Sequence, residues 1–211
     1  MTKMNEAPSL PKIAAIVLAA GMSTRMGRAK ALLSWGGSPL VRHQVIALTS
    51  QPEITLVVVV VGHRRKEVTD AIQGTRAHTI VNRKYREGRA TSLVAGALAL
   101  ADIGSTAVMV VNVDQPLTPE ILRPLIRASG ARSQALLRPS YLSKPGHPII
   151  LPADIAPELK LATDANFGLR AIVKRHSERI SHVAVESELA VLNLNTTSEF
   201  DAACSRYAAV S

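Results

Sequence analysis

Short apolar runs without polar alternation recur along the 211-residue chain, and they limit its fold more than any other feature. The clearest are Ile54–Val60 and Ala107–Asn112. Both are far shorter than the roughly 20 apolar residues that a membrane helix needs. Runs rich in Val, Ile and Leu are typical of strands covered on both faces. They alternate with amphipathic stretches, which predicts a three-layer α/β fold: a mostly parallel sheet with helices on both faces.

The predicted strands are bounded by changes in hydropathy and by turn residues. In chain order they are Ile13–Ala19, Ile54–Val60, His78–Val81, Ala107–Asn112, Ala135–Arg138, Pro148–Leu151, His182–Val185 and Ala190–Leu194.

Helices are predicted between these strands from capping residues and apolar spacing. Thr118 precedes a proline and marks a helix start with Pro at the first helical position. Thr91 or Ser92 is the expected cap of a small apolar helix over Leu93–Ala101. A last helix over residues 200–208 has apolar side chains at i, i+3, i+4 and i+7.

Composition bounds the organisation of the chain. At 22.5 kDa and 47% hydrophobic residues, the chain is large enough for one well-packed domain. We expect that domain over residues 13–211, after a flexible leader over residues 1–12. The only cysteine is Cys204, so no disulfide forms within the chain. With no apolar signal segment near the start, the sequence predicts a cytoplasmic protein without a membrane span.

The charge balance points to an anionic partner. The formal net charge is +9, yet only 3% of residues are aromatic. Proteins that bind single-stranded nucleic acid need aromatic platforms for the bases. The basic residues are also dispersed, so a nucleic-acid partner is disfavoured and phosphate-rich small molecules are favoured.

A glycine-rich loop after the first strand is the most informative segment. Residues 18–30 read Leu-Ala-Ala-Gly-Met-Ser-Thr-Arg-Met-Gly-Arg-Ala-Lys, with two glycines, two hydroxyls and three cations. Such a loop brings backbone N–H groups and positive charge to an anion. It is not a Walker A loop, because five residues separate Gly21 from Gly27, and it lacks the GxGxxG of dinucleotide sites.

This loop resembles that of the nucleotidyltransferases related to molybdenum cofactor cytidylyltransferase, and the likeness continues through residues 30–33 and 37–40. The resemblance implies a Rossmann-like nucleotidyltransferase fold in which the loop binds a nucleoside triphosphate (NTP). Arg25 and Lys30 would lie on phosphate oxygens and take part in catalysis. The alanines before Gly21 are typical of relatives that transfer cytidylyl or uridylyl groups, which favours CTP. The loop residues expected to bind the nucleotide are Leu18, Ala19, Ala20, Gly21, Ser23, Thr24, Arg25 and Lys30.

Asp114 ends a buried strand, where ligands of open α/β sheets bind. A carboxylate facing a basic phosphate loop suits Mg²⁺, and a structural Asp in a turn before proline is the alternative. The resemblance implies that Asp114 is catalytic and ligates Mg²⁺. The second family ligand matches Asn195, where this chain has an amide in place of a carboxylate. Asn195 is therefore either a weaker Mg²⁺ ligand or the N-cap of the last helix.

Two further segments match the family. Asn82, Gly88 and Ser92 resemble residues that lie against the base and ribose. His147, in a Gly-His-Pro turn, resembles the border of the acceptor pocket, where an exposed imidazole would hold an acceptor phosphate. The alternative for His147 is that it only shapes the turn.

The resulting hypothesis is transfer of a nucleoside monophosphate, CMP from CTP in the favoured case, to a phosphorylated acceptor. The favoured acceptor is molybdopterin or molybdenum cofactor, with hand-over of the product to a molybdoenzyme. A sugar phosphate or other small phosphorylated acceptor is the first alternative. A non-catalytic nucleotide-binding cofactor chaperone is the second, favoured by Asn193 and Asn195 in place of carboxylates.

Overall fold

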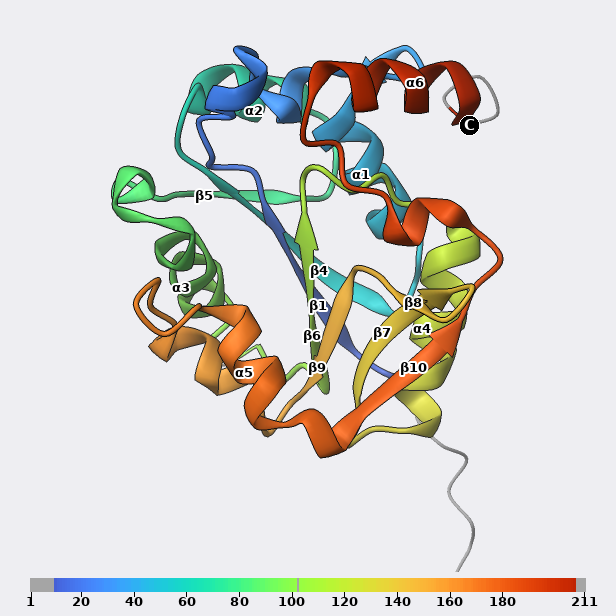
Figure 1. The fold of residues 1–211 in the computed structure, drawn as a ribbon. Helices are drawn as coiled ribbons and strands as arrows, with labels where there is room; N and C mark the ends of the chain where they lie inside the picture. Colours follow the sequence, from blue (N-terminus) through green and yellow to red (C-terminus); the bar gives the residue numbers. More distant parts are fainter. Residues whose placement is uncertain (1–9, 102, 208–211) are drawn as a thin grey trace, which may run out of the picture.

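An eight-stranded sheet forms the middle layer of the computed structural model, which describes residues 10–101 and 103–207 (Figure 1). Its strand order is β10–β7–β9–β6–β1–β4–β5, with β8 paired to β7, and β2 and β3 form a separate pair. The strands are β1 Ile13–Leu18, β2 Ser34–Trp35, β3 Ser38–Pro39, β4 Ile54–Val61, β5 His78–Val81, β6 Ala107–Asn112, β7 Leu136–Tyr141, β8 Lys144–Pro145, β9 Ile149–Pro152 and β10 Ile180–Ala184.

The helices cover both faces of this sheet (Figure 1). They are α1 Leu40–Thr49, α2 Arg65–Ala71, α3 Arg89–Ala99, α4 Pro119–Ala131, α5 Leu169–Arg175 and α6 Thr197–Tyr207. Short 3₁₀ helices occupy Thr24–Met26, Lys30–Leu32, Tyr85–Glu87, Ala156–Leu161, Ser177–Arg179 and Glu188–Val191.

The central strand β1 explains why the sheet is buried on both sides. It pairs in parallel with β4 and with β6. Ile13, Ala15 and Val17 face one apolar cluster, built with α1, α2, α4 and α6. Ala14 and Ile16 face a second cluster, built with α3, α5 and the 3₁₀ helix Ala156–Leu161. Successive residues of a strand point to opposite faces of the sheet. Because both faces are covered here, the residues on both faces are apolar, and the strand sequence is one continuous apolar run.

The predicted three-layer α/β fold with a mostly parallel sheet is confirmed. Two strands are antiparallel to their neighbours: β9, between β6 and β7, and the short β8, which pairs with β7. The domain assignment stays a prediction, and residues 1–9 of the expected leader lie outside the described residues. No helix in residues 10–101 and 103–207 has both the length and the hydropathy needed to cross a membrane.

Two predicted elements are wrong in the structure. The expected strand Ala190–Leu194 is instead the end of the 3₁₀ helix Glu188–Val191 and an extended segment. That segment makes isolated backbone hydrogen bonds and no strand ladder. One example is the Leu194 N–H, which donates to the carbonyl of Asp114, just after β6, at 3.1 Å. Helix α3 begins at Arg89 rather than Leu93, so Thr91 and Ser92 lie inside it and do not cap it.

Candidate active site

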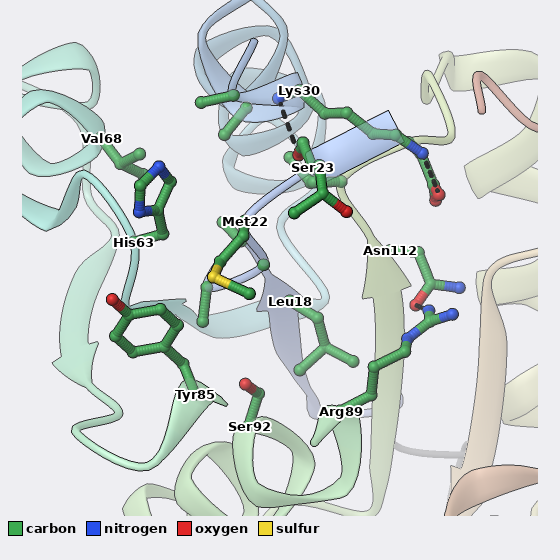
Figure 2. Close-up of a pocket in the computed structure, with 18 of the residues that line it drawn as sticks. Leu18, Met22, Ser23, Lys30, His63, Val68, Tyr85, Arg89, Ser92 and Asn112 are labelled. Carbon is green, nitrogen blue, oxygen red and sulfur yellow. Dashed lines mark hydrogen bonds and ion pairs between the residues drawn. The ribbon is translucent and has the colours of Figure 1, made fainter. Parts of the chain in front are cut away.

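A pocket of about 330 Å³ opens at the carboxyl ends of the parallel strands β1, β4 and β6 (Figure 2). This is where open α/β sheets bind ligands. Its lining contains most of the residues that the sequence placed in a nucleotide site. The lining residues are Leu18, Ala19, Ala20, Gly21, Met22, Ser23, Thr24, Ala29, Lys30, Ala31, His63, Val68, Tyr85, Gly88, Arg89, Ser92, Asn112, Val113, Asp114 and Asn195.

The glycine-rich loop turns sharply after β1 and carries Lys30 back over the pocket. Ser23 has a φ of 52° and Gly27 a φ of 62°, both left-handed. The Ser23 hydroxyl accepts the Lys30 N–H at 3.1 Å, which closes the turn. A methyl group on Gly21 would meet nothing within 4 Å, so this position leaves the pocket open. The side chain of Arg25 is outside the described part of the structure, so its predicted contact with phosphate stays a prediction.

Lys30, Asp114 and Asn195 all line the pocket, and their side chains meet there. The Lys30 Nζ donates to Asp114 Oδ2 at 3.1 Å and to Asn195 Oδ1 at 3.1 Å. The Lys30 and Asp114 side chains are only 12% and 18% exposed. Residues from three distant stretches of the chain therefore form one compact cluster, and their predicted roles toward phosphate and metal stay predictions.

A chain of side-chain amides holds this cluster from behind. The Nε2 of the fully buried Gln44 donates to the carbonyls of Asn112 and Gln115, at 2.9 and 2.6 Å. Asn112 Nδ2 donates to Gln115 Oε1 at 3.2 Å, and Gln115 Nε2 to Asn193 Oδ1 at 2.8 Å. Since buried polar groups are costly unless paired, this chain fixes the segment around Asn193 against the end of β6. Sequence reasoning missed Gln44, whose position on a helix gave no signal.

Asn195 is not the N-cap of α6. Thr196 and Glu199 form a capping box: Thr196 Oγ1 accepts the Glu199 N–H at 3.2 Å, and the Glu199 carboxylate accepts the Thr196 N–H at 2.9 Å. Glu199 also accepts the Asn195 N–H at 2.9 Å. These backbone hydrogen bonds, from Thr196 and then Asn195, lower the pKa of Glu199. The cap leaves the Asn195 side chain for Lys30.

The residues expected at the base divide into two groups. Ser92 lines the pocket, while Asn82 lies beneath it and is 5% exposed. Asn82 Nδ2 donates to the hydroxyls of Thr91 and Ser92, both at 2.9 Å, and its Oδ1 accepts the Lys84 N–H at 2.9 Å. Asn82 thus orients Thr91 and Ser92 from below, is not among the residues that line the pocket, and its contact with a nucleotide stays a prediction.

Gly88 lines the pocket, but a different neighbour requires the glycine. Its φ is 135°, and a methyl group would lie 1.9 Å from Asp164 Oδ2. The Asp164 carboxylate accepts the N–H groups of Arg89 and Ala90, at 3.1 and 3.0 Å. A carboxylate 75 residues further along the chain therefore caps α3, and Gly88 makes room for it.

One wall of the pocket was not predicted. His63 and Tyr85 lie 6.3 Å apart between ring centroids, with Met22 in front of them (Figure 2). His63 follows β4 directly, and the argument used for Asp114, that strand ends meet at one edge, would have located it. Arg89, from the basic run 83–89, also lines the pocket and donates to Asn112 Oδ1 at 3.4 Å.

His147 does not line this pocket, and the prediction of an exposed imidazole is wrong. The side chain is half-buried, and the His147–Pro148 peptide bond is cis. Burial, with Arg138 nearby, lowers the pKa of His147 to about 4. A neutral imidazole gives an acceptor phosphate no charge attraction. The His147 N–H donates to the Ala190 carbonyl at 2.8 Å, which supports the alternative that this residue shapes the turn.

The donor set at Lys30 fits a hard divalent cation. Asp114 Oδ2 and Asn195 Oδ1 both lie 3.1 Å from one Nζ, so two oxygen ligands converge where a cation already is. Mg²⁺ is commonly held by one or two carboxylates together with substrate phosphates. No group of three His, Cys, Asp or Glu suited to a metal occurs in residues 10–101 and 103–207. The remaining ligands would have to be phosphate oxygens and water.

The fold is an α/β sheet with a pocket at its strand ends, and comparison with known families makes the class specific. Residues 15–180 match the model of the MobA-like NTP transferase domain. The chain belongs to the MobA-like NTP transferase family.

Individual relatives differ in the activities that their names describe. The bifunctional IPC transferase and DIPP synthase of Rubrobacter xylanophilus is 34% identical over 135 residues, which is 61% of this chain and 30% of that protein. The nicotine blue oxidoreductase of Paenarthrobacter nicotinovorans is 28% identical over 176 residues, 79% of this chain and 83% of that protein. A nucleotidyl transferase structure from Methanothermobacter thermautotroptrophicus has a TM-score of 0.77 at 22% identity, covering 92% of this chain and 97% of that one.

The chain matches only 26% to 30% of the length of the first four curated relatives. It therefore shares one domain with those longer proteins.

Proposed function

We propose that this protein is a nucleotidyltransferase that transfers a nucleoside monophosphate from an NTP to a phosphorylated small-molecule acceptor and releases pyrophosphate. The observation that carries the proposal is the convergence of Lys30 and Asp114 beneath the glycine-rich loop, inside a pocket of about 330 Å³. In-line displacement at a phosphate asks a protein mainly for alignment and for charge stabilisation. The pocket offers both.

Each residue has a distinct proposed role. Lys30 and Arg25 stabilise the charge of the departing pyrophosphate, and backbone N–H groups near Gly21 hold phosphate oxygens. Ser92, oriented by Asn82, faces the base and ribose. Arg89 supplies a further cation on the opposite side of the pocket from His63 (Figure 2).

Asp114 and Asn195 are the residues that would hold Mg²⁺. When bound, such an ion supplies charge neutralisation at the reacting phosphate. An acceptor that is a phosphate monoester is already ionised near neutral pH, so no general base is required. This agrees with the position of His147, which does not line the pocket.

The favoured substrates are CTP and molybdopterin or molybdenum cofactor, with the product handed on to a molybdoenzyme. The support is the Ala19-Ala20-Gly21 sequence and the family membership. A sugar phosphate is the alternative acceptor. His147, the residue expected at the acceptor, does not line the pocket, so the structure favours neither acceptor over the other.

The decisive experiment measures pyrophosphate release for the four NTPs against molybdopterin and a panel of sugar phosphates, with Mg²⁺ present. We expect release with CTP and molybdopterin. Pyrophosphate release only with a sugar phosphate would support the same transfer reaction with a different acceptor. Tight NTP binding with no release from any pair would instead support a nucleotide-binding chaperone, the function that the amides at 193 and 195 favour.

Substitution links the activity to the site. Lys30→Ala and Asp114→Ala should each lower turnover by about 10²-fold or more, because charge stabilisation of the transition state is lost. Lys66→Ala is the matched control, since its side chain is 86% exposed on α2. Turnover of either site variant within about twofold of wild type would contradict the assignment.

A further inference from the structure

The contact between Lys30 and the two expected metal ligands has a consequence for how a cation enters the site. The Nζ of Lys30 lies 3.1 Å from Asp114 Oδ2 and 3.1 Å from Asn195 Oδ1. An ammonium group has hydrogen-bond donors only, so it engages the amide of Asn195 through its oxygen. The two oxygens that would face a divalent ion therefore face a lysine in the nucleotide-free protein.

We infer that Lys30 is a built-in counter-cation that holds the divalent-ion position until an NTP arrives, so that the metal enters with the triphosphate and not before it. The inference rests on the proposed function, because it assumes that a triphosphate occupies the loop. It concerns the order of binding at the site and not the transfer step.

Charge supports this order. Asp114 is the one carboxylate of the pair, and Lys30 already balances it at 3.1 Å. The partner at position 195 is an amide, which adds no charge to attract an ion. With both side chains less than one-fifth exposed, a cation entering the nucleotide-free site would be repelled by Lys30 with little screening.

Geometry shows that Lys30 can leave without unfolding the loop. Its backbone N–H is fixed by Ser23 Oγ at 3.1 Å, and it is the first residue of the 3₁₀ helix Lys30–Leu32. Only the flexible four-carbon stem needs to turn toward a phosphate. Asp114 and Asn195 stay where they are, because Leu194 N–H bonds to the Asp114 carbonyl at 3.1 Å and the Asn195 N–H bonds to Glu199.

The test is a titration of the full chain with Mn²⁺ in the absence of nucleotide. Electron paramagnetic resonance measures the free Mn²⁺ at each point. We expect weak binding in wild type. Lys30→Met removes the ammonium and should tighten Mn²⁺ binding by about tenfold or more. Lys30→Gln is the second variant, since its amide retains a donor for Asp114 and protects the fold. Adding Asp114→Asn to either variant should abolish the gain.

A matched control separates this specific contact from the general positive field. Arg28 lies on the same loop, is exposed, and does not line the pocket. Arg28→Met removes one charge and should change Mn²⁺ affinity by less than about twofold, because an exposed charge is screened. Unchanged Mn²⁺ affinity in both Lys30 variants, or an equal gain in Arg28→Met, would overturn the inference.

Adding a non-hydrolysable NTP analogue completes the experiment. It should tighten Mn²⁺ binding to wild type more than to Lys30→Met, since only wild type has a lysine to displace. These measurements need no acceptor and no transfer. If the Lys30 variants bind Mn²⁺ more tightly but the protein releases no pyrophosphate, the inference holds and the proposed reaction is rejected. If the protein releases pyrophosphate but the Lys30 variants bind Mn²⁺ as wild type does, the reaction holds and the inference is rejected.

Discussion

Gly21 and Gly88 both line the pocket, yet a methyl group would meet different surroundings at each. At Gly88 it would lie 1.9 Å from Asp164 Oδ2, on a backbone with a φ of 135°. At Gly21 it would meet nothing within 4 Å. Gly88 is required by the fold, whereas Gly21 leaves room beside the loop for a ligand.

Gly88→Ala should therefore lower the free energy of unfolding by about 2–4 kcal/mol, through backbone strain and the clash with Asp164. Gly21→Ala should change it by less than about 1 kcal/mol and instead weaken NTP binding several-fold. Urea unfolding and NTP titration of both variants distinguish the two roles. Wild-type NTP affinity in Gly21→Ala would show that the ligand does not approach this loop.

His147 makes a pH-dependent contribution to stability. Burial holds its pKa at about 4 in the folded protein, below the ordinary value of 6.5. The unfolded chain therefore binds more protons between these values, and the folded state loses stability as pH falls through this range. From about pH 7 to about pH 5 we expect His147 to account for a loss of about 1–2 kcal/mol.

Urea unfolding of wild type and His147→Gln at about pH 7 and about pH 5 measures the contribution of His147 to this loss of stability. The variant should show a smaller loss on acidification. The residual slope belongs to other groups, including His43, whose pKa is also lowered by burial. Equal pH dependence of the two proteins would mean that His147 is not a source of the acid sensitivity.

Sequence reasoning located the residues whose chemistry is local. Lys30 and Asp114 follow from a glycine-rich loop and a strand end, and both lie in the pocket. It did not find the contacts that some of these residues make. Asn82 bonds to Ser92 beneath the pocket, and Gly88, which lines the pocket, makes room for Asp164, 76 positions later in the sequence. A single sequence carries no signal for such pairings.

At the level of elements, α3 and α6 are capped in two different ways. Helix α6 uses the local capping box of Thr196 and Glu199. Helix α3 uses Asp164, from the loop before α5. The local cap is visible in sequence as Thr-x-x-Glu, whereas the remote cap is not. This is why the predicted start of α3 was four residues late.

Removing the local cap should loosen α6. Thr196→Ala is expected to lower the free energy of unfolding by about 1 kcal/mol, the usual loss for an N-cap hydroxyl. Ser198→Ala, on the same exposed turn, is the control and should change it by less than about 0.5 kcal/mol. Urea unfolding measures both. Equal effects of the two substitutions would argue against the capping box.

The remote cap predicts coupling between α3 and the loop of Asp164. Asp164→Ala should cost about 1–2 kcal/mol and reduce the hydrogen-exchange protection of the Arg89 and Ala90 amides. It should also relieve the clash in Gly88→Ala, so the double variant should be more stable than the sum of the single losses predicts. Strict additivity in this cycle would show that Gly88 is needed for another reason.

Prediction succeeded for several elements, and these did not all have continuous apolar runs. The bounds of β5 and β6 agree with the structure, and α4 begins at Pro119 after Thr118 as expected. The failure at Ala190–Leu194 has a physical cause: strand-like composition does not reveal whether a sheet edge is available. Here β10 already forms the edge, and the segment crosses the strand ends instead.

For the whole molecule, the net charge of +9 should act on nucleotide affinity. Positive side chains around the pocket attract a triphosphate, and salt screens that attraction. Raising KCl from about 50 to about 500 mM should weaken NTP binding several-fold in calorimetry. An affinity that does not respond to salt would mean that uncharged contacts dominate. Na⁺ in place of K⁺ is the control for a specific ion effect.

The path of the chain through the site also bears on its synthesis. The pocket is built from residues 18–31, 63–92 and 112–114, and Asn195 completes it from the segment before α6. A growing polypeptide that has emerged only as far as residue 190 has the loop and Asp114 but lacks one of the two oxygens that hold Lys30. The pocket lining is therefore complete only after residue 195 has been synthesised, and a protein truncated before Asn195 would leave Lys30 with Asp114 as its one side-chain partner in this contact.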